Sequence, residues 1–505
     1  MAEPLRIGID VGGTNTDAVA VDRHGVVRTR TKEPTTENPA EGIAAALHVV
    51  ADGHLIESVA LGTTHAINAI LQRRGLRRVA VLRLGAPGTL AVPPLSGWPD
   101  DLARALVGDV LVASGGVEVD GRAHPLDRDE LCRFASSLDA DVTAIAVTGT
   151  FSPLDPAQEE EAASIIAETV RLPISLGHNI GGLGLLEREN ATVLNAALGD
   201  VIEHVIGGFE AAVATLGSHV AAFLTQNDGT LMSPTFARRA PVFTIGSGPS
   251  NSLRGAAALT GRTDVIVADV GGTSTDVGAL VQRFPRESSV GVTVGGVTTN
   301  FRMPDLVSVA VGGGTTVRGG RLMQVSVARR IRDEALVFGG STPTLTDAAV
   351  AAGRATIGDV ERVAGRDDLE PALREAETLV ADAIDQMRPS SAEVDLVLVG
   401  GGSVLLPDIL PGVRTLVRPD HADVANAVGA ALAPVAGEAE QIADIGGERR
   451  AAAIERCLDE ARSRAVAAGA DARRLTTVWV EEIPLAYMDR PLSRIRAKVA
   501  GPAVL

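Results

Sequence analysis

One eight-residue pattern occurs twice in the chain, and it limits the possible folds more than any other feature. Asp10–Asp17 reads DVGGTNTD and Asp269–Asp276 reads DVGGTSTD, and a short apolar run precedes and follows each copy. Because such runs around a Gly-Gly pair are typical of two antiparallel strands joined by a tight turn, each copy predicts a β-hairpin. A plain hairpin turn is the alternative for a single copy, whereas two matching copies favour a shared role.

The glycine turn of each copy has the chemistry of a phosphate-binding loop. Glycine lacks a Cβ atom, so a phosphate can approach the turn and meet backbone amides that point outward. The threonine hydroxyls and the residue at the variable position can add contacts. The predicted phosphate-binding residues are Gly12, Gly13, Thr14, Asn15, Gly271, Gly272, Thr273 and Ser274.

An aspartate ends the first strand of each predicted hairpin. Asp10 and Asp269 would place carboxylates where a hydrated Mg²⁺ sits, with a water between Asp10 and the ion. Asp269 could also orient an attacking oxygen or act as a general base. The alternative for both is a strand-end aspartate that caps a turn. Asp17 and Asp276 either bind metal or stabilise their own hairpins.

A third glycine-rich segment follows a strand of the buried type. Val394–Pro407 reads VDLVLVGGGSVLLP, and a bare turn before a helix is the alternative to a ligand loop. Further on, Ala422–Ala436 reads ADVANAVGAALAPVA, a small-residue helix with Gly429 inside it. Glycine there costs about 1 kcal/mol relative to alanine, so we expect a close helix–helix contact at Gly429.

These four elements follow one another in the order typical of the actin, Hsp70 and sugar kinase superfamily, which the sequence resembles. The resemblance implies an α/β, two-lobed, actin-like (ribonuclease H-like) fold that binds ATP and Mg²⁺ between its lobes. It also implies that the third segment approaches the adenosine and that the small-residue helix lies at the interlobe hinge. The residues expected near the adenosine are Gly400, Gly401, Gly402 and Ser403.

Five further segments resemble the hydantoinase A/5-oxoprolinase family of this superfamily, and together the likeness covers about residues 5–435. The chain is similar to the short, non-fused members. The segments are LGTTHAINAILQRRG at Leu61–Gly75, LLERENATVLNAAL at Leu185–Leu198, QNDGTLMS and IGSGPSNS within Gln226–Ser252, VGGGTT at Val311–Thr316 and LTDA at Leu345–Ala348.

The length of 505 residues is large for one core, so we expect about three folded units. The expected divisions are an N-terminal lobe with the first hairpin over residues 1–175, a second lobe with the second hairpin and glycine loop over 176–437, and a small α/β extension over 438–505. Within the extension the sequence predicts a helix at Glu448–Ala468 and two strands after it.

The family resemblance implies an ATP-dependent hydrolase, or a subunit of one, that phosphorylates a carbonyl oxygen of a hydantoin, 5-oxoproline or related lactam before ring opening. It also implies a second protein subunit, and self-association is open. His65 lies where the family lines its substrate cleft, and a structural histidine is the alternative. Two other functions remain: a small-molecule kinase, and a nucleotide-gated activase or binding protein.

Composition excludes several classes of partner. A net charge of -17 and an aromatic content of 2% argue against nucleic acid, and no apolar run is long enough to span a bilayer. Cys132 and Cys457 lack CxxC partners, and we expect a cytoplasmic protein. The chain has only two lysines, Lys32 and Lys498, and neither follows a Walker A loop. Phosphate binding is therefore expected to use amides, hydroxyls, a metal or arginine.

Overall fold

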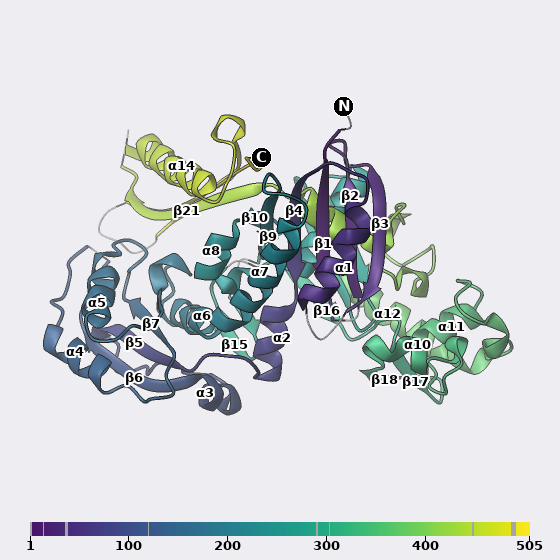
Figure 1. Ribbon diagram of the computed structural model, residues 1–505, viewed down its shortest axis with the longest axis horizontal. Helices are drawn as coiled ribbons and strands as arrows, with labels where there is room; N and C mark the ends of the chain where they lie inside the picture. Colours follow the sequence, from purple (N-terminus) through teal and green to yellow (C-terminus); the bar gives the residue numbers. More distant parts are fainter. Residues whose placement is uncertain are drawn as a thin grey trace.

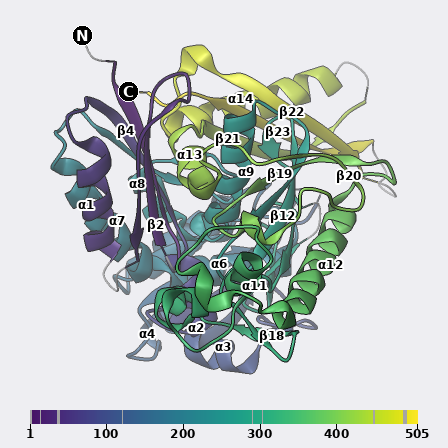
Figure 2. The same cartoon turned by 90° about the vertical axis from the view of Figure 1, so that its right-hand side faces the viewer.

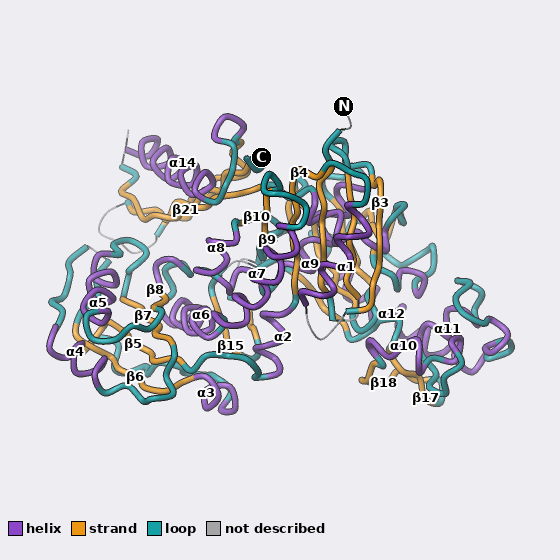
Figure 3. Tube along the Cα trace, in the orientation of Figure 1, coloured by secondary structure: helices purple, strands orange, loops and turns teal. Residues whose placement is uncertain are grey.

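The computed structural model describes residues 3–13, 15–35, 39–119, 121–288, 291–301, 303–446, 449–485 and 491–504. Its strands form sheets of nine, six and four strands and two smaller sheets of two strands each, with helices packed beside them (Figure 1). Figure 3 shows the alternation of strands and helices along the same trace. Within these ranges, no helix combines the length and apolar character needed to cross a membrane.

The first sheet carries the first hairpin. Its strand order is β22-β23-β21-β10-β9-β4-β1-β2-β3. Helices α1 (Pro39–Ala51) and α7 (Gly199–Ala214) pack on it, and their side chains share a buried core with Ile7, Ile9 and Leu61. The strands are β1 (Leu5–Val11), β2 (Asn15–Val21), β3 (Val27–Pro34), β4 (Ile56–Thr63), β9 (Ala221–Thr225), β10 (Leu231–Met232), β21 (Val435–Asp444), β22 (Thr476–Pro484) and β23 (Leu492–Gly501).

The second sheet carries the second hairpin. Its order is β13-β12-β11-β19-β20, and β16 also pairs with β12. The apolar side of α12 (Glu370–Met387) packs against this sheet, so that Leu373 and Val380 share a core with Ile266 and Leu396. The strands are β11 (Val265–Val270), β12 (Thr275–Val281), β13 (Phe284–Pro285), β16 (Leu306–Val309), β19 (Val394–Val399) and β20 (Val413–Val417).

The four-stranded sheet is parallel and has the order β6-β5-β7-β8. Residues of α4 (Arg128–Ser136) and α5 (Ala157–Ala167) share one core with the sheet, and residues of α6 (Leu185–Ala197) share another. It lies beside the first lobe at the lower left of Figure 1. Its strands are β5 (Val79–Ala86), β6 (Val107–Ser114), β7 (Ala144–Gly149) and β8 (Ile174–Leu176).

Two helices connect the large sheets. The chain leaves the first sheet after β10 and reaches β11 through α9 (Ser247–Thr260), and it returns from β20 to β21 through α13 (Ala425–Ala431). Figure 2 shows these helices between β2 and β19. A Cβ atom at Gly429 would lie 1.9 Å from the Asn251 carbonyl oxygen, and one at Gly255 would lie 1.8 Å from that of Ala425. The predicted close helix contact at Gly429 is thus confirmed.

The C-terminal segment extends the first sheet instead of forming a sheet of its own. The predicted helix and strands are present as α14 (Arg449–Ala467), β22 and β23, and α14 packs on β21 and β23. Since β9, β10 and β21 also belong to the first sheet, that sheet crosses the boundaries expected at residues 175 and 437. Pairing between distant strands decides sheet membership, and chain order alone does not reveal it.

A lysine joins this extension to both large sheets. Lys498 of β23 is buried, and its Nζ lies 2.6 Å from Asp228 Oδ2, 2.9 Å from Glu287 Oε1 and 3.0 Å from Glu438 Oε1. Asp228 follows β9 of the first sheet, whereas Glu287 follows β13 of the second. Three carboxylates therefore match the three donors of one ammonium group where the two lobes meet.

Candidate functional site at the interlobe helices

The two hairpins have the same geometry. Asp10 lies opposite Asp17 across β1 and β2, and Asp269 lies opposite Asp276 across β11 and β12. The Gly12 amide donates to the Asn15 carbonyl at 3.0 Å, and the Gly271 amide donates to the Ser274 carbonyl at 2.9 Å. The prediction of two matching antiparallel hairpins is confirmed. Thr14 lies outside the described residues.

Helix α9 brings the two strand-end aspartates to one place. Asn251 Nδ2 lies 3.5 Å from Asp10 Oδ1, and the hydroxyl of the next residue, Ser252, donates to Asp269 Oδ2 at 2.5 Å. Consecutive residues of one helix thus contact an acid from each lobe. The two hairpins therefore meet the same helix at the junction of the lobes.

Helix α13, on the return connection from the second sheet to the first, also contacts the first hairpin. Asn426 Nδ2 donates to Asp10 Oδ2 at 2.9 Å and to Asp17 Oδ2 at 3.1 Å. Both carboxylate oxygens of Asp10 therefore have an amide donor, one from each interlobe helix. Neutral donors hold the carboxylate in place while leaving its negative charge uncompensated.

A glycine on β4 makes room for these contacts. Gly62 lies directly opposite Asp10 in the sheet. A Cβ atom at Gly62 would lie 2.3 Å from Asn251 Nδ2 and 2.5 Å from Asp10 Oδ1. Any larger residue would separate the aspartate from the helix. Gly62 and Asn251 lie in segments that resemble the family, and Asn426 lies in the small-residue helix, but none of the three was predicted as a site residue.

Burial changes the protonation of both strand-end acids. It raises the pKa of Asp10 to about 6, with the charge of Asp17 as the next cause. Burial also raises the pKa of Asp269 to about 6, and the hydrogen bond from Ser252 opposes this rise. A bound cation would reverse both effects, because it favours the ionised carboxylates. This buried acidic pair between two amide-bearing turns fits a metal–nucleotide complex.

The GGGS loop packs against the second hairpin. Gly400 has a positive φ of 83°, and a Cβ atom there would lie 2.3 Å from Asp269 Oδ1. The Gly402 amide donates to the Val270 carbonyl at 2.7 Å, while a Cβ atom at Gly401 would meet nothing within 4 Å. Ser403 begins a short 3₁₀ helix. The loop therefore leaves an open side at Gly401, next to the acid of the second hairpin.

A second glycine turn contacts the tip of this hairpin. The Gly313 amide donates to the Gly271 carbonyl at 3.0 Å, and the Gly314 amide donates to the Gly272 carbonyl at 2.7 Å. A Cβ atom at Gly312 would lie 2.6 Å from the Thr273 amide nitrogen. The VGGGTT segment thus holds the Gly271–Gly272 turn of the second hairpin in place, an arrangement that the sequence did not predict.

His65 lies beside the first hairpin, at the start of α2 (His65–Gln72). Its Nδ1 is 2.6 Å from the Thr63 hydroxyl, and the Thr64 amide donates to the Val11 carbonyl at 3.2 Å. Burial, followed by the charge of His204, lowers the pKa of the imidazole and favours its neutral form. The structure places His65 near the end of β1, and its role remains a prediction.

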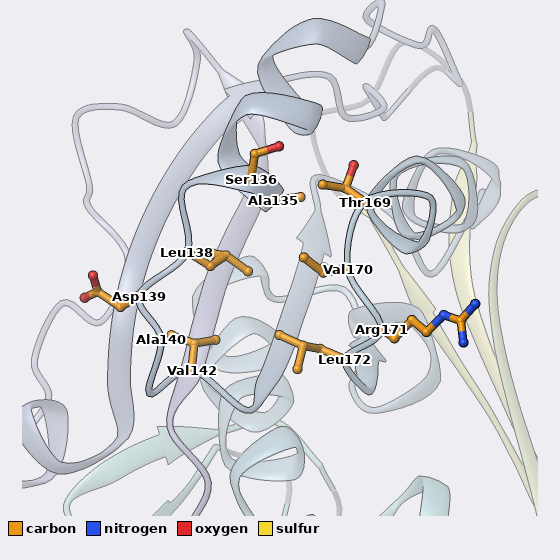
Figure 4. Close-up of a pocket in the computed structure, with 10 residues that line it drawn as sticks. All are labelled: Ala135, Ser136, Leu138, Asp139, Ala140, Val142, Thr169, Val170, Arg171 and Leu172. Carbon is orange, nitrogen blue, oxygen red and sulfur yellow. The ribbon is translucent and has the colours of Figure 1, made fainter.

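A separate hollow of about 480 Å³ lies at the amino ends of β7 and β8. In Figure 4 the side chains of Leu138, Val170 and Leu172 face it, while Asp139 and Arg171 point away. No set of polar groups converges there among its lining residues. Because binding sites for polar substrates combine concavity with convergent polar groups, we assign the chemistry to the interlobe site instead.

Comparison with known proteins identifies the family of the chain. The sequence profile of the hydantoinase/oxoprolinase N-terminal region matches residues 6–170, and that of hydantoinase/oxoprolinase matches residues 188–386. The chain belongs to the hydantoinase/oxoprolinase family. This membership confirms the family resemblance that the sequence motifs had indicated.

Two curated relatives of this family member are subunits of larger enzymes. The acetophenone carboxylase gamma subunit of Aromatoleum aromaticum is 27% identical over 393 residues, which cover 69% of this chain and 53% of that protein. The caprolactamase subunit alpha of Pseudomonas jessenii is 26% identical over 309 residues, which cover 54% and 43% respectively. The chain therefore spans about half the length of these relatives.

Two solved structures share the fold of this family member. Nucleotide-free acetone carboxylase has a TM-score of 0.70 at 17% identity, with 99% of this chain and 88% of that chain covered. The ATP-dependent caprolactamase of Pseudomonas jessenii has a TM-score of 0.71 at 17% identity, with 98% and 87% covered. The α/β, two-lobed, actin-like fold predicted from the motif order is thus confirmed.

Proposed function

We propose that this chain binds MgATP between its two hairpins and transfers the γ-phosphoryl group to the carbonyl oxygen of a cyclic amide. The observation that carries the proposal is the pair Asn251 and Ser252, since adjacent residues of α9 hold one hairpin acid each. Phosphoryl transfer depends mainly on positioning and charge stabilisation, and this contact fixes the two acids relative to one helix.

Each part of the site has a role in this proposal. The amides of both glycine turns bind phosphate oxygens, and the loop at Gly400–Gly402 borders the adenosine. Asp10 would hold a hydrated Mg²⁺, whose charge would neutralise that of the phosphates. Asp269 would orient the attacking oxygen, and His65, whose Nδ1 contacts the Thr63 hydroxyl, would contact the substrate.

Phosphorylation makes chemical sense for a lactam. An amide carbonyl is a poor electrophile, because its nitrogen donates electron density to the carbon. When the carbonyl oxygen bonds to the γ-phosphorus, the bond from that phosphorus to the bridging oxygen breaks and ADP leaves. Water can then add to the carbon, and the C–N bond opens as the nitrogen takes up a proton, which leaves an acyl phosphate. A second water hydrolyses this acyl phosphate to the carboxylate and free phosphate. The relatives are named as subunits, so we propose that a second polypeptide completes this hydrolysis.

The test is ADP release from the purified chain with MgATP, alone and with hydantoin, 5-oxoproline or caprolactam. We expect one such ring to stimulate release, and both Asp10→Ala and Asp269→Ala to lower it by about 10³-fold or more, a typical loss for removed phosphoryl-transfer groups. Asp52→Asn, at an exposed position, is the matched control and should leave the rate unchanged.

Product analysis separates this function from its rivals. ADP, phosphate and a ring-opened product support the proposal, whereas a stable phosphorylated product identifies a small-molecule kinase. ATP hydrolysis stimulated by a protein and by none of the rings identifies a nucleotide-gated activase. If calorimetry detects no MgATP binding by the wild-type chain, with or without its co-expressed partner, the proposal is wrong.

A further inference from the structure

The first lobe has a row of four facing residues, three of them charged, that crosses four strands. Gly62, Asp10, Asp17 and Lys32 lie opposite one another in sequence on β4, β1, β2 and β3. The second lobe repeats the row with Asp269, Asp276 and Ser308 on β11, β12 and β16, and the Ser308 hydroxyl donates to Asp276. The two rows therefore differ at the outer position, where one lobe has a cation and the other a hydroxyl.

Lys32 is the cation of this site. Its Nζ lies 2.6 Å from Asp17 Oδ1, and Asp17 is in turn joined to Asp10 through Asn426. Over the described ranges of the chain, no other lysine or arginine forms an ion pair with any of the four hairpin aspartates. A site that receives a polyanion thus has one positive side chain beside its first turn.

The position of Lys32 leaves it able to change partners. Its side chain is 35% exposed, whereas that of Asp17 is 8% exposed. Lys498, the other lysine, is instead buried against three carboxylates. An ammonium has three donors on a flexible stem, so one contact with Asp17 leaves capacity for a second anion.

Strand β3 is also held against the phosphate turn itself. The hydroxyl of Thr35, just beyond the strand, donates to the Gly12 carbonyl at 2.8 Å. Lys32 lies three residues before Thr35, on the strand that borders the hairpin. The same contact that stabilises the turn therefore keeps Lys32 close to it.

We propose that Lys32 binds the terminal phosphates of the nucleotide, and that its ammonium moves from Asp17 to those phosphates when MgATP enters. This inference deepens the proposed function and rests on it. Asp17 is then the resting partner that holds the lysine beside the site. The proposed change of partner explains why this position has a lysine in a chain whose other cations are nearly all arginine. A guanidinium would form a fixed bidentate pair with Asp17 and could not move to the phosphates.

The test is calorimetric titration with ATP, ADP and AMP, each with Mg²⁺, on wild type, Lys32→Met, Asp17→Asn and the double variant. We expect Lys32→Met to weaken ATP binding about 10- to 100-fold, the usual range for a lost charge-assisted hydrogen bond, and to leave AMP binding within about 2-fold. Arg30→Met is the matched control, because Arg30 lies on the same strand and pairs with Asp423 instead. It should bind ATP as the wild type does.

The double variant distinguishes two roles of Lys32: binding of the nucleotide phosphates, and neutralisation of the Asp17 charge alone. If Lys32 binds phosphate, ATP affinity stays low when Asp17→Asn is combined with Lys32→Met. Recovery of wild-type affinity in the double variant overturns the proposal, and so does unchanged affinity in Lys32→Met. Should Lys32→Met fail to fold, Lys32→Gln and the double variant carry the same comparison. A wild-type chain that does not bind ATP refutes the proposed function itself, which is a separate result.

Discussion

Replacing Asp269 by asparagine should make the nucleotide-free protein more stable at neutral pH while abolishing its activity. Burial raises the pKa of the Asp269 carboxyl from 3.8 to about 6. A group whose pKa is raised on folding stabilises the protein at low pH, and that stability is lost as pH rises through its folded pKa. A rise from 3.8 to about 6 corresponds to about 3 kcal/mol above pH 7.

Asparagine has nearly the same shape and carries no charge, so it avoids this cost and can still accept the hydrogen bond from Ser252. For cooperative unfolding of a chain of 505 residues, about 3 kcal/mol corresponds to a rise in Tm of about 3 °C. The advantage should fall to about half at pH 5, where much of the wild-type carboxyl is protonated.

The assay is differential scanning calorimetry in EDTA at pH 7.5 and pH 5, followed by ADP release with MgATP. The control Asp52→Asn, at an exposed position, should change the free energy of unfolding by less than about 0.5 kcal/mol at both pH values. A Asp269→Asn variant that is no more stable than wild type at pH 7.5, or whose advantage does not depend on pH, would refute the reasoning.

Four further substitutions test the architecture. Lys498→Met removes the ammonium shared by three carboxylates and should lower the free energy of unfolding by about 3 kcal/mol in urea denaturation; a loss below about 1 kcal/mol would contradict this. Gly62→Ala puts a Cβ atom 2.5 Å from Asp10 Oδ1 and should weaken MgATP binding at least about 10-fold in calorimetry, so wild-type affinity would count against the site. Gly429→Ala, whose Cβ would lie 1.9 Å from a carbonyl oxygen of α9, should destabilise the fold by about 1–3 kcal/mol. Gly207→Ala in α7, where a Cβ meets nothing within 4 Å, should instead stabilise it by up to about 1 kcal/mol.

The local elements of the site could be predicted from the sequence because their signals are local. The two DVGGTxTD copies predicted both hairpins, and the strand before GGGS predicted β19 and its loop. Gly429 predicted a close helix contact, since a glycine inside a helix has a cost that only packing offsets. Motif order then predicted the two-lobed fold, which structural comparison confirms.

The contacts that assemble the site depend on tertiary structure. Asn251, Ser252 and Asn426 are ordinary polar residues in the sequence. They contact the hairpin aspartates only because α9 and α13 pass between the two large sheets. Likewise, the register of β2 and β3 places Lys32 beside Asp17. The sequence had instead predicted that backbone amides, hydroxyls, a metal or arginine bind phosphate, and that prediction did not include Lys32.

The sequence by itself determined the groups that are available: two glycine turns, two strand-end acids and a glycine loop after a buried strand. The tertiary structure decided which of these meet, and it added the C-terminal strands β22 and β23 to the first sheet. The physical reason is the sequence separation over which each kind of interaction acts. Turn formation and strand propensity depend on neighbours a few residues away, whereas the bond between Asn426 and Asp10 joins residues 416 positions apart. Only a packed fold can set such a contact.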